Sequence, residues 1–500
     1  MNAAATFPLC VAGVTIDPVR RRISGAGGEA TIEPLVMQLL LQLVERQGQV
    51  LPRRELFDHL WGNAQVGDDS LNRLVGSLRK ALERTSGDAV QIETVPRVGY
   101  RLIAEQATNG RMLPVTRRSL IAAGASSVVI LCGAGLWRAQ DARAAEAQRG
   151  IDRGDILLRD AVPLQAGEAT PPLRSALEIE PGNAKALGLL ALAEETRANN
   201  GGSANAGETL RAAETAARAA LRRDPNEPHA RLAMIDITAG SLDWSQMEDR
   251  LEDLRGSAPT NLHVLGALTS FLQAAGRTSK SWVYNEQAAA LAPASPTPQW
   301  RRALRLWTAG RTEDALNLSE RLLPLWPRHA LVWNARFMVL AFTGRTGAAE
   351  AMLRDAAASA GNSHPARPEQ WLPTLAAFAE ASPPRIVRAR DANLAAAQRN
   401  PGQATYAAMA LSQLGEVDAA FQVIDALLLS KGPLVANRPI VPHSFVANSP
   451  SWCRTQWLFM PPLAAVRRDA RFKGLCEEIG LARYWRQRGV GPDTRLPNSA

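Results

Sequence analysis

The chain is poor in the residues that build reactive or metal-binding centres. Its 500 residues include four cysteines and six histidines. No two cysteines form a C-x-x-C pair, so their spacing offers no zinc site. We find no P-loop, G-x-S-x-G, H-E-x-x-H or paired-carboxylate motif. We therefore expect no enzyme activity, no cofactor and no metal.

We also expect no N-terminal signal peptide, because residues 1–20 hold no apolar run of sufficient length. A long uncharged apolar run lies further along instead, at residues 119–137. At ~1.5 Å per residue, a helix of this length spans close to the ~30 Å core of a bilayer. Arg117 and Arg118 precede it, which favours a cytoplasmic N-terminal side. We predict a transmembrane helix; the alternative is a buried helix of a soluble protein.

The net charge of +9 does not by itself identify a partner. A basic balance is compatible with nucleic acid or with an anionic membrane surface. Residues 1–118 hold 15 Lys and Arg against 12 Asp and Glu, a net charge of only +3. Any DNA-binding site must therefore be a local feature of the surface.

Residues 1–105 read as a small α+β domain. Short alternating runs in the first thirty residues predict an antiparallel sheet. Helices are expected at Glu33–Arg46 and Arg53–Leu60, and a third begins at Asp68–Ser70. The third helix carries apolar residues at the spacing of one buried stripe, namely Leu71, Leu74, Val75, Leu78 and Leu82. A hairpin follows, with its turn at Pro96–Gly99.

The opposite face of the third helix is polar and basic, and the hairpin has a basic tip at Arg97. A helix beside a basic hairpin is how a winged helix holds DNA, with the helix in the major groove and the hairpin on the backbone or minor groove. The alternative for the helix alone is an ordinary solvated face. Gly76 has low helix propensity, which a close approach of DNA backbone or simple surface tolerance would explain.

The order of these motifs resembles the winged-helix output domain of bacterial response regulators. Leu60-Trp61-Gly62, Asp68-Asp69-Ser70-Leu71 and Ile92–Leu102 carry the resemblance, over about residues 7–104. It is strongest to membrane-bound activators of the ToxR/CadC type. The resemblance implies that the recognition helix is Asp69–Arg84 and that the Gly62–Gly67 loop engages RNA polymerase. The residues we expect to contact DNA are Asn72, Arg73, Ser77, Arg79, Lys80, Thr94 and Arg97.

A repeat of 34 residues marks the rest of the chain. It separates four prolines, Pro225, Pro259, Pro293 and Pro327, and also the Gly-Arg pairs at 276–277, 310–311 and 344–345. Glycine within the repeat and proline at its end, between Ala-rich helical stretches, are typical of tetratricopeptide helix pairs. We expect at least three repeats and as many as eight. Ten of the twelve tryptophans lie here, and we interpret them as core rather than as a ligand cage.

The last segment, 458–486, resembles the closing part of regulators with such tails and is expected to cap the repeats. Cys453 and Cys476 could form a disulfide in an oxidising periplasm, although the sequence does not show that they meet.

The sequence therefore predicts a multi-domain protein. Its expected parts are a winged helix at 1–105, a linker at 106–118, one transmembrane helix at 119–137 and an all-α tetratricopeptide-like solenoid at 138–500. We expect a single-pass regulator of the bacterial inner membrane, with its N-terminus cytoplasmic and its C-terminus periplasmic. Expected partners are double-stranded promoter DNA, RNA polymerase, a second copy on DNA and an unidentified periplasmic protein or peptide. The alternatives are a membrane-anchored scaffold with a vestigial head, and a soluble cytoplasmic regulator in which 119–137 is buried.

Overall fold

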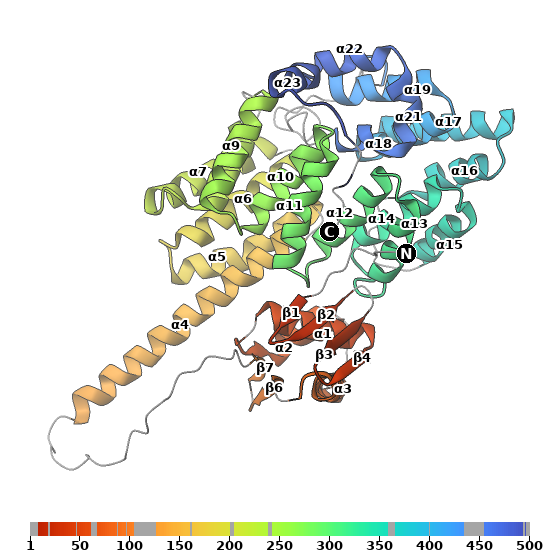
Figure 1. Cartoon of the computed structure of the whole chain (residues 1–500). Helices are drawn as coiled ribbons and strands as arrows, with labels where there is room; N and C mark the ends of the chain where they lie inside the picture. The colour runs from red at the N-terminus through yellow and green to blue at the C-terminus, as the bar shows by residue number, and fades with distance from the viewer. Residues whose placement is uncertain are drawn as a thin grey trace.

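The structure is a computed structural model. It describes residues 9–18, 21–46, 48–61, 68–87, 89–96, 98–104, 127–160, 163–200, 205–238, 243–358, 366–399, 401–434, 455–493 and 496. Residues 9–104, called the head below, and residues 127–496, called the tail, form its two parts (Figure 1).

The head contains two antiparallel sheets. Strands β1 (Leu9–Val11), β2 (Val14–Asp17), β3 (Arg22–Gly25) and β4 (Gly28–Thr31) pair in sequence order. The second sheet has the order β5-β7-β6, from β5 (Leu51–Pro52), β7 (Gly99–Ala104) and β6 (Val90–Val95). The strands predicted in both regions are therefore confirmed, within one or two residues at their ends.

Three helices pack on these sheets, and they are α1 (Pro34–Glu45), α2 (Arg53–Trp61) and α3 (Asp68–Ser86). Proline at the first turn of α1 fits there because its missing N–H has no intrahelical partner. Apolar residues of all three helices and of both sheets form one buried cluster, in which Met37, Leu40 and Leu56 are fully buried. The sheet, three helices and hairpin follow one another as the sequence predicts.

Helix α4 (Ser127–Asp160) begins the tail and runs without a break through residue 137, where we placed the end of the transmembrane helix. Figure 1 shows its N-terminal part projecting alone from the rest of the tail. Residues 119–126 lie outside the described residues. Among the helices that the structure describes, none combines the length and apolar character needed to cross a bilayer. The predicted transmembrane helix is thus unsupported by the structure.

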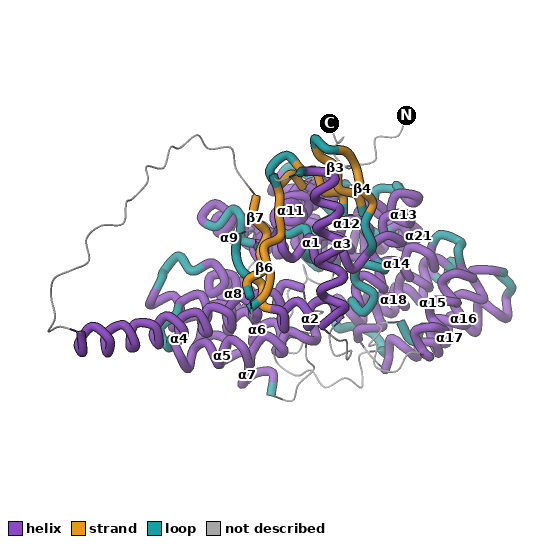
Figure 2. Tube along the Cα trace, turned by 90° about the horizontal axis from the view of Figure 1, so that it is seen from below, coloured by secondary structure: helices purple, strands orange, loops and turns teal. Residues whose placement is uncertain are grey.

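Pairs of antiparallel helices build the tail (Figure 2). After η1 (Pro163–Ala169) come α5 (Thr170–Ile179), α6 (Ala184–Asn200), α7 (Ala206–Arg223), α8 (Pro228–Thr238), α9 (Trp244–Ser257), α10 (Leu262–Ala274), α11 (Thr278–Leu291), α12 (Pro296–Thr308), α13 (Thr312–Leu322), α14 (Ala330–Phe342) and α15 (Thr346–Ala358). The next elements are α16 (Pro368–Ala379), α17 (Pro383–Arg399), α18 (Pro401–Gln413), α19 (Val417–Ile424) and the π-helical η3 (Asp425–Leu429).

The repeat glycines end the first helix of each pair. Gly276, Gly310 and Gly344 have φ of +76°, +77° and +80°, a left-handed conformation that glycine adopts without steric cost. The residue after each donates its N–H to a carbonyl five residues earlier, as Arg277 does to Leu272 at 2.8 Å. These bonds are the Schellman closure of a helix end. The helical tail is thus consistent with the predicted tetratricopeptide-like architecture.

The tryptophans of the tail pack mainly in its core. Trp307 and Trp333 are 2% and 6% exposed, and Trp300 and Trp326 are partly buried against the hydrophobic clusters. The Trp333 ring stacks on Phe337 at 5.0 Å between centroids. The burial of these rings agrees with the prediction that the tryptophans belong to the core, and not with an exposed aromatic cage for a ligand.

The C-terminal segment folds back on the middle of the tail instead of covering only its last repeat. Its elements are η4 (Gln456–Phe459), η5 (Pro461–Leu463), α21 (Ala464–Arg468), α22 (Arg471–Glu478) and α23 (Leu481–Arg488). Trp244 Nε1 donates to Ile479 O at 2.7 Å, and Trp485 Nε1 donates to Ala275 O at 2.9 Å. The segment therefore joins α9–α11 to α18–α19 (Figure 1).

The possible Cys453–Cys476 disulfide stays a prediction, because one of its two cysteines is not among the described residues. Cys476 is a free thiol, 2% exposed, and Cys453 lies outside the described residues. Burial, with a contribution from neighbouring Glu477, raises the pKa of the Cys476 thiol to about 12. Because the thiolate is the reactive form, this cysteine is expected to be inert.

The head rests against the tail through α1 and α2. Arg159 Nη1 of α4 lies 2.8 Å from Glu45 Oε1 of α1, and both side chains are mostly buried. Leu325 of the tail is fully buried in the same apolar cluster as the head core. A cavity of about 280 Å³, lined among others by Leu41 of the head and Trp326 of the tail, lies at this contact. The contact brings together surfaces that the predicted topology would place on opposite sides of a membrane.

Two acidic groups inside the tail should make its stability depend on pH. Burial, and then the nearby Asp236 carboxylate, raise the pKa of Glu195, while burial raises the pKa of Asp236 to about 7. Asp236 Oδ1 is buried without a hydrogen-bond partner. The folded tail favours the protonated form of both acids. Their contribution to the stability of the tail is therefore complete below about pH 4, the pKa of such acids in the unfolded chain, and is lost as the pH rises through about 7.

We therefore expect Asp236→Asn to raise the melting temperature of the tail by several degrees at pH 8 and by less at pH 5. Scanning calorimetry of the full chain at both pH values measures this difference. An equal effect of the substitution at the two pH values would show that Asp236 is already ionised in the folded tail.

Candidate DNA-binding surface

Helix α3 is held in the head by its apolar stripe. Leu71, Val75, Leu78 and Leu82 are at most 1% exposed, as the spacing predicts. This anchors one face of α3 and turns the opposite face outward. Figures 1 and 2 place α3 and the β6–β7 hairpin on the side of the head away from the tail. The head–tail contact therefore leaves this face uncovered.

Five of the predicted DNA-contacting residues are exposed on α3, and three of these do not take part in the bonds that engage Asn72 and Arg79. The three are Arg73, Ser77 and Lys80. Within the described part of the chain, their side chains have no hydrogen-bond or ion-pair partner. Guanidinium and ammonium groups in this state can pair with phosphate oxygens or guanine acceptors, and a hydroxyl can pair with any base edge.

Arg79 and Thr94 bind each other instead of pointing separately at solvent. Arg79 donates from Nε and Nη2 to Ile92 O at 3.0 and 2.8 Å, and from Nη2 to Thr94 Oγ1 at 2.7 Å. These bonds join α3 to β6, so they fix the angle between helix and hairpin. Both residues remain predicted DNA contacts, and the structure adds a positioning role.

Asn72 is likewise part of an internal network. Its Oδ1 accepts hydrogen bonds from Arg53 Nη2 and from the Tyr100 hydroxyl, both at 2.8 Å. Arg53 also donates to Tyr100 Oη at 2.9 Å. The network joins the start of α2, the start of α3 and strand β7, so Asn72 has only its amide N–H groups left for DNA. Arg53 and Tyr100 were missed from the sequence because nothing in their spacing shows that they meet.

The hairpin has the predicted form of a wing. Strands β6 and β7 pair in register from Val90↔Ala104 to Val95↔Gly99. An ion pair between Glu93 and Arg101 crosses the two strands. Arg97, predicted at the tip, lies outside the described residues. Its neighbour Val98 is 47% exposed, so an apolar side chain also stands at the tip.

Gly76 lies between the exposed cations of α3. A Cβ added there would meet nothing within 4 Å, so packing inside the head does not require glycine. We expect Gly76→Ala to stabilise the head by about 1 kcal/mol, the difference in helix propensity, and to weaken DNA binding by removing space for the backbone of DNA. Calorimetry and fluorescence anisotropy with labelled DNA measure the two effects. If affinity is unchanged while stability rises, Gly76 reflects surface tolerance only.

Comparison with known proteins agrees with this geometry. Residues 27–102 match the family described as "Transcriptional regulatory protein, C terminal". The chain is 35% identical over 89 residues to the transcriptional activator CadC of Escherichia coli, which is 18% of this chain and 17% of CadC. It is 36% identical over 84 residues to the cholera toxin homolog transcriptional activator of Vibrio parahaemolyticus, covering 16% of this chain and 28% of that protein.

A solved structure, the DNA-binding domain of Escherichia coli CadC, is also similar. It is 33% identical, with a TM-score of 0.19, and the match covers 20% of this chain and 96% of that domain. The chain thus spans less than a third of the length of the two activators, and the family match lies within the head.

Proposed function

We propose that this chain is a one-component transcription regulator that binds promoter DNA. The premise is that its head is a winged-helix DNA-binding domain of the transcriptional regulatory protein family. The observation that carries the proposal is the exposed basic face of α3 beside the β6–β7 wing. The exposed cations Arg73 and Lys80 supply phosphate contacts, and the Arg79–Thr94 bond holds the wing at the angle that lets both elements reach one duplex. RNA polymerase is a proposed second partner of the head.

We further propose that the chain is anchored in the bacterial inner membrane, with a periplasmic tail that senses or docks a protein or peptide. The uncharged run at 119–137 and the arginines before it support this arrangement. Two heads held close on one membrane would bind paired half-sites more tightly than separate heads, because each raises the effective concentration of the other. Pairing of the tails would then control promoter occupancy.

A second arrangement is favoured by a different observation. The Glu45–Arg159 ion pair and the burial of Leu325 in the head cluster support an arrangement in which head and tail lie in the same compartment. A membrane between them would separate these surfaces, so this contact and a periplasmic tail exclude each other within one molecule. In this arrangement the tail controls the head by direct contact.

One crosslinking experiment separates the two arrangements. Glu45→Cys and Arg159→Cys are introduced together into a chain otherwise lacking cysteine, and cells are treated with a short bifunctional thiol reagent. A periplasmic tail predicts no crosslink within one chain, and Arg159→Cys should react with a membrane-impermeant thiol reagent in intact spheroplasts. An efficient intrachain crosslink, with no labelling from outside, would contradict the periplasmic tail.

The regulatory proposal has its own test. Deleting the gene should change transcription of genes beside it or elsewhere, and Arg73→Ala with Lys80→Ala should reproduce the deletion. A chain with both substitutions that restores wild-type transcription would favour the scaffold with a vestigial head.

A further inference from the structure

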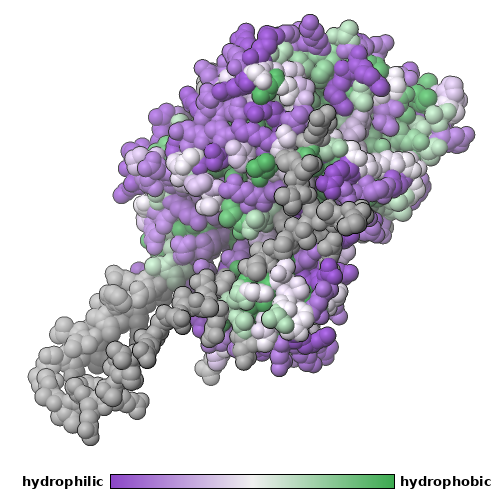
Figure 3. All heavy atoms as spheres, in the orientation of Figure 1, coloured by the Kyte–Doolittle hydropathy of each residue, from purple (hydrophilic) through white to green (hydrophobic). Residues whose placement is uncertain are grey.

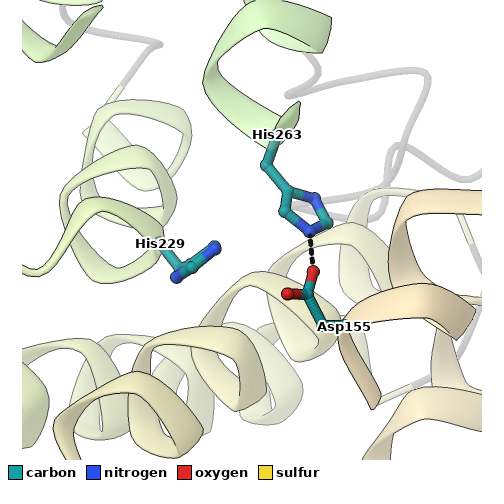
Figure 4. A group of neighbouring side chains, drawn as sticks. All are labelled: Asp155, His229 and His263. Atoms are coloured by element: carbon teal, nitrogen blue, oxygen red, sulfur yellow. Dashed lines mark hydrogen bonds and ion pairs between the residues drawn. The ribbon is translucent and has the colours of Figure 1, made fainter. Parts of the chain in front are cut away.

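Two histidines in equivalent places of neighbouring repeats meet a carboxylate of α4. His229 and His263 are 34 residues apart and are each the second residue of a helix, α8 and α10. Their rings lie edge to face with centroids 5.2 Å apart. Asp155 reaches them from α4, as Figure 4 shows. The repeat thus stacks two imidazoles, and α4 adds the third side chain.

The ligand atoms of the three groups lie close together, but not yet at the spacing of ligands around a bound metal ion. One ligand atom from each of Asp155, His229 and His263 lies within 4.8 Å of the other two. The shortest separation is 2.7 Å, between His263 Nε2 and Asp155 Oδ1. In a tetrahedral zinc site, ligands at ~2.0–2.1 Å from the ion stand roughly 3.3–3.5 Å apart. Small side-chain rotations would bring these three groups to that spacing.

Neighbouring groups prepare His229 as a metal ligand. Glu227 Oε1 lies 2.7 Å from His229 Nδ1, so the ring donates its Nδ1–H to the carboxylate. Asn261 Oδ1 accepts from the backbone N–H groups of His263 and Val264, which turns Asn261 Nδ2 toward His229 Nε2 at 3.0 Å. His229 Nε2 therefore carries a lone pair, which accepts the Asn261 N–H here and which a metal ion would take over by displacing that hydrogen bond. A carboxylate behind a histidine is the usual outer shell of a zinc-bound imidazole.

The cluster opens into a pocket that can admit an ion and a further ligand. The pocket has a volume of about 520 Å³ and is also lined by Asp224 and Thr260. Zinc sites that are not purely structural bind three protein groups and leave the fourth position to water or another ligand.

Lys185 competes with a cation here. Its Nζ lies 3.3 Å from Asp155 Oδ2, while Oδ1 of the same carboxylate bonds His263. An ammonium group near the ligands weakens metal binding by repulsion. If the three side chains form only a hydrogen-bonded contact between helices, without metal, the Lys185–Asp155 pair would instead stabilise that contact. The effect of removing Lys185 therefore distinguishes the two.

We propose that Asp155, His229 and His263 bind a divalent ion of the zinc type and thereby fasten α4 to α8 and α10. Two imidazoles and one carboxylate favour zinc and its neighbours over magnesium or calcium. The metal would control how rigidly α4 joins the repeats. Because α4 is the tail helix nearest to the head in sequence, a change in its rigidity would reach the head. This regulatory step rests on the proposed DNA-binding function, whereas metal binding itself does not.

The test is titration of the purified full chain with zinc chloride by calorimetry, and with cobalt, whose absorption reports tetrahedral ligation. We expect the wild-type chain to bind one ion through this cluster. His263→Gln or Asp155→Asn should weaken binding more than the about 10–100-fold expected of Glu227→Gln, a change behind the ligand. Lys185→Met should tighten binding. His329→Ala removes a histidine outside the cluster and should leave affinity unchanged.

Zinc binding that survives His229→Asn with His263→Gln, or that weakens in Lys185→Met, would overturn the metal site. Circular dichroism of each variant establishes that the tail is folded. For the regulatory step, zinc should change the affinity of wild-type chain for promoter DNA and not that of His263→Gln. Zinc binding without any change in DNA affinity would overturn the regulatory step alone, and absence of DNA binding with or without zinc would instead count against the proposed function.

Discussion

Replacing Gly99 with alanine is expected to unfold the head and abolish DNA binding. A Cβ at this position would lie 1.8 Å from the carbonyl oxygen of Leu51 and 2.9 Å from the Cα of Pro52. Both are backbone atoms of β5, which pairs with β7 at Pro52↔Gly99, so no side-chain rotation relieves the clash. We expect a cost of about 4 kcal/mol or more, at the upper end for single substitutions. Such a loss is comparable with the ~5–15 kcal/mol that stabilises a whole domain.

Scanning calorimetry of the full chain measures this loss in the transition of the head. Gly76→Ala is the matched control, because it adds the same methyl group where no atom lies within 4 Å. A Gly99→Ala chain that keeps the wild-type melting temperature of the head would mean that β5 and β7 do not approach each other as described.

Removing Arg73 and Lys80 together is expected to weaken DNA binding without unfolding the head. Both are exposed on α3 and have no partner in the described part of the chain. Each lost contact should cost about 1–3 kcal/mol. The slope of log affinity against log salt concentration should fall by ~0.9 for each phosphate contact removed. Fluorescence anisotropy of the full chain at several salt concentrations measures both quantities.

Arg22→Ala provides the control for this experiment. Arg22 is also partly exposed, but it lies in the N-terminal sheet and pairs with Glu29 at 2.7 Å. An exposed pair of this kind contributes little stability, so DNA affinity and salt dependence should stay at their wild-type values. Equal losses for Arg22→Ala and the Arg73→Ala, Lys80→Ala chain would show that net charge, and not the face of α3, drives binding.

Local patterns were sufficient to predict the elements of the head and the helix ends of the tail. The stripe from Leu71 to Leu82 shows the buried face of α3 because its spacing follows the helix itself. The glycines at 276, 310 and 344 predict helix ends because they adopt a backbone conformation that other residues avoid.

Contacts between distant segments could not be predicted in the same way. Asn72 reads as a DNA contact because its spacing on α3 is visible, whereas its bonds to Arg53 and Tyr100 depend on how three elements meet. The hydrogen bond from Trp485 to the carbonyl of Ala275 likewise could not be predicted from the sequence. The histidine pair is an intermediate case: its 34-residue separation was available, but its meeting with Asp155 required the position of α4.

Hydroxyl-radical footprinting of the full chain on the DNA upstream of its own gene tests the central claim most directly. If α3 lies in the major groove and the wing on the adjoining backbone, protection should form short patches on one face of the duplex, and the patches should disappear with Arg73→Ala and Lys80→Ala. Uniform weak protection that random DNA competes away equally well, or patches that persist in the substituted chain, would contradict DNA recognition through this surface.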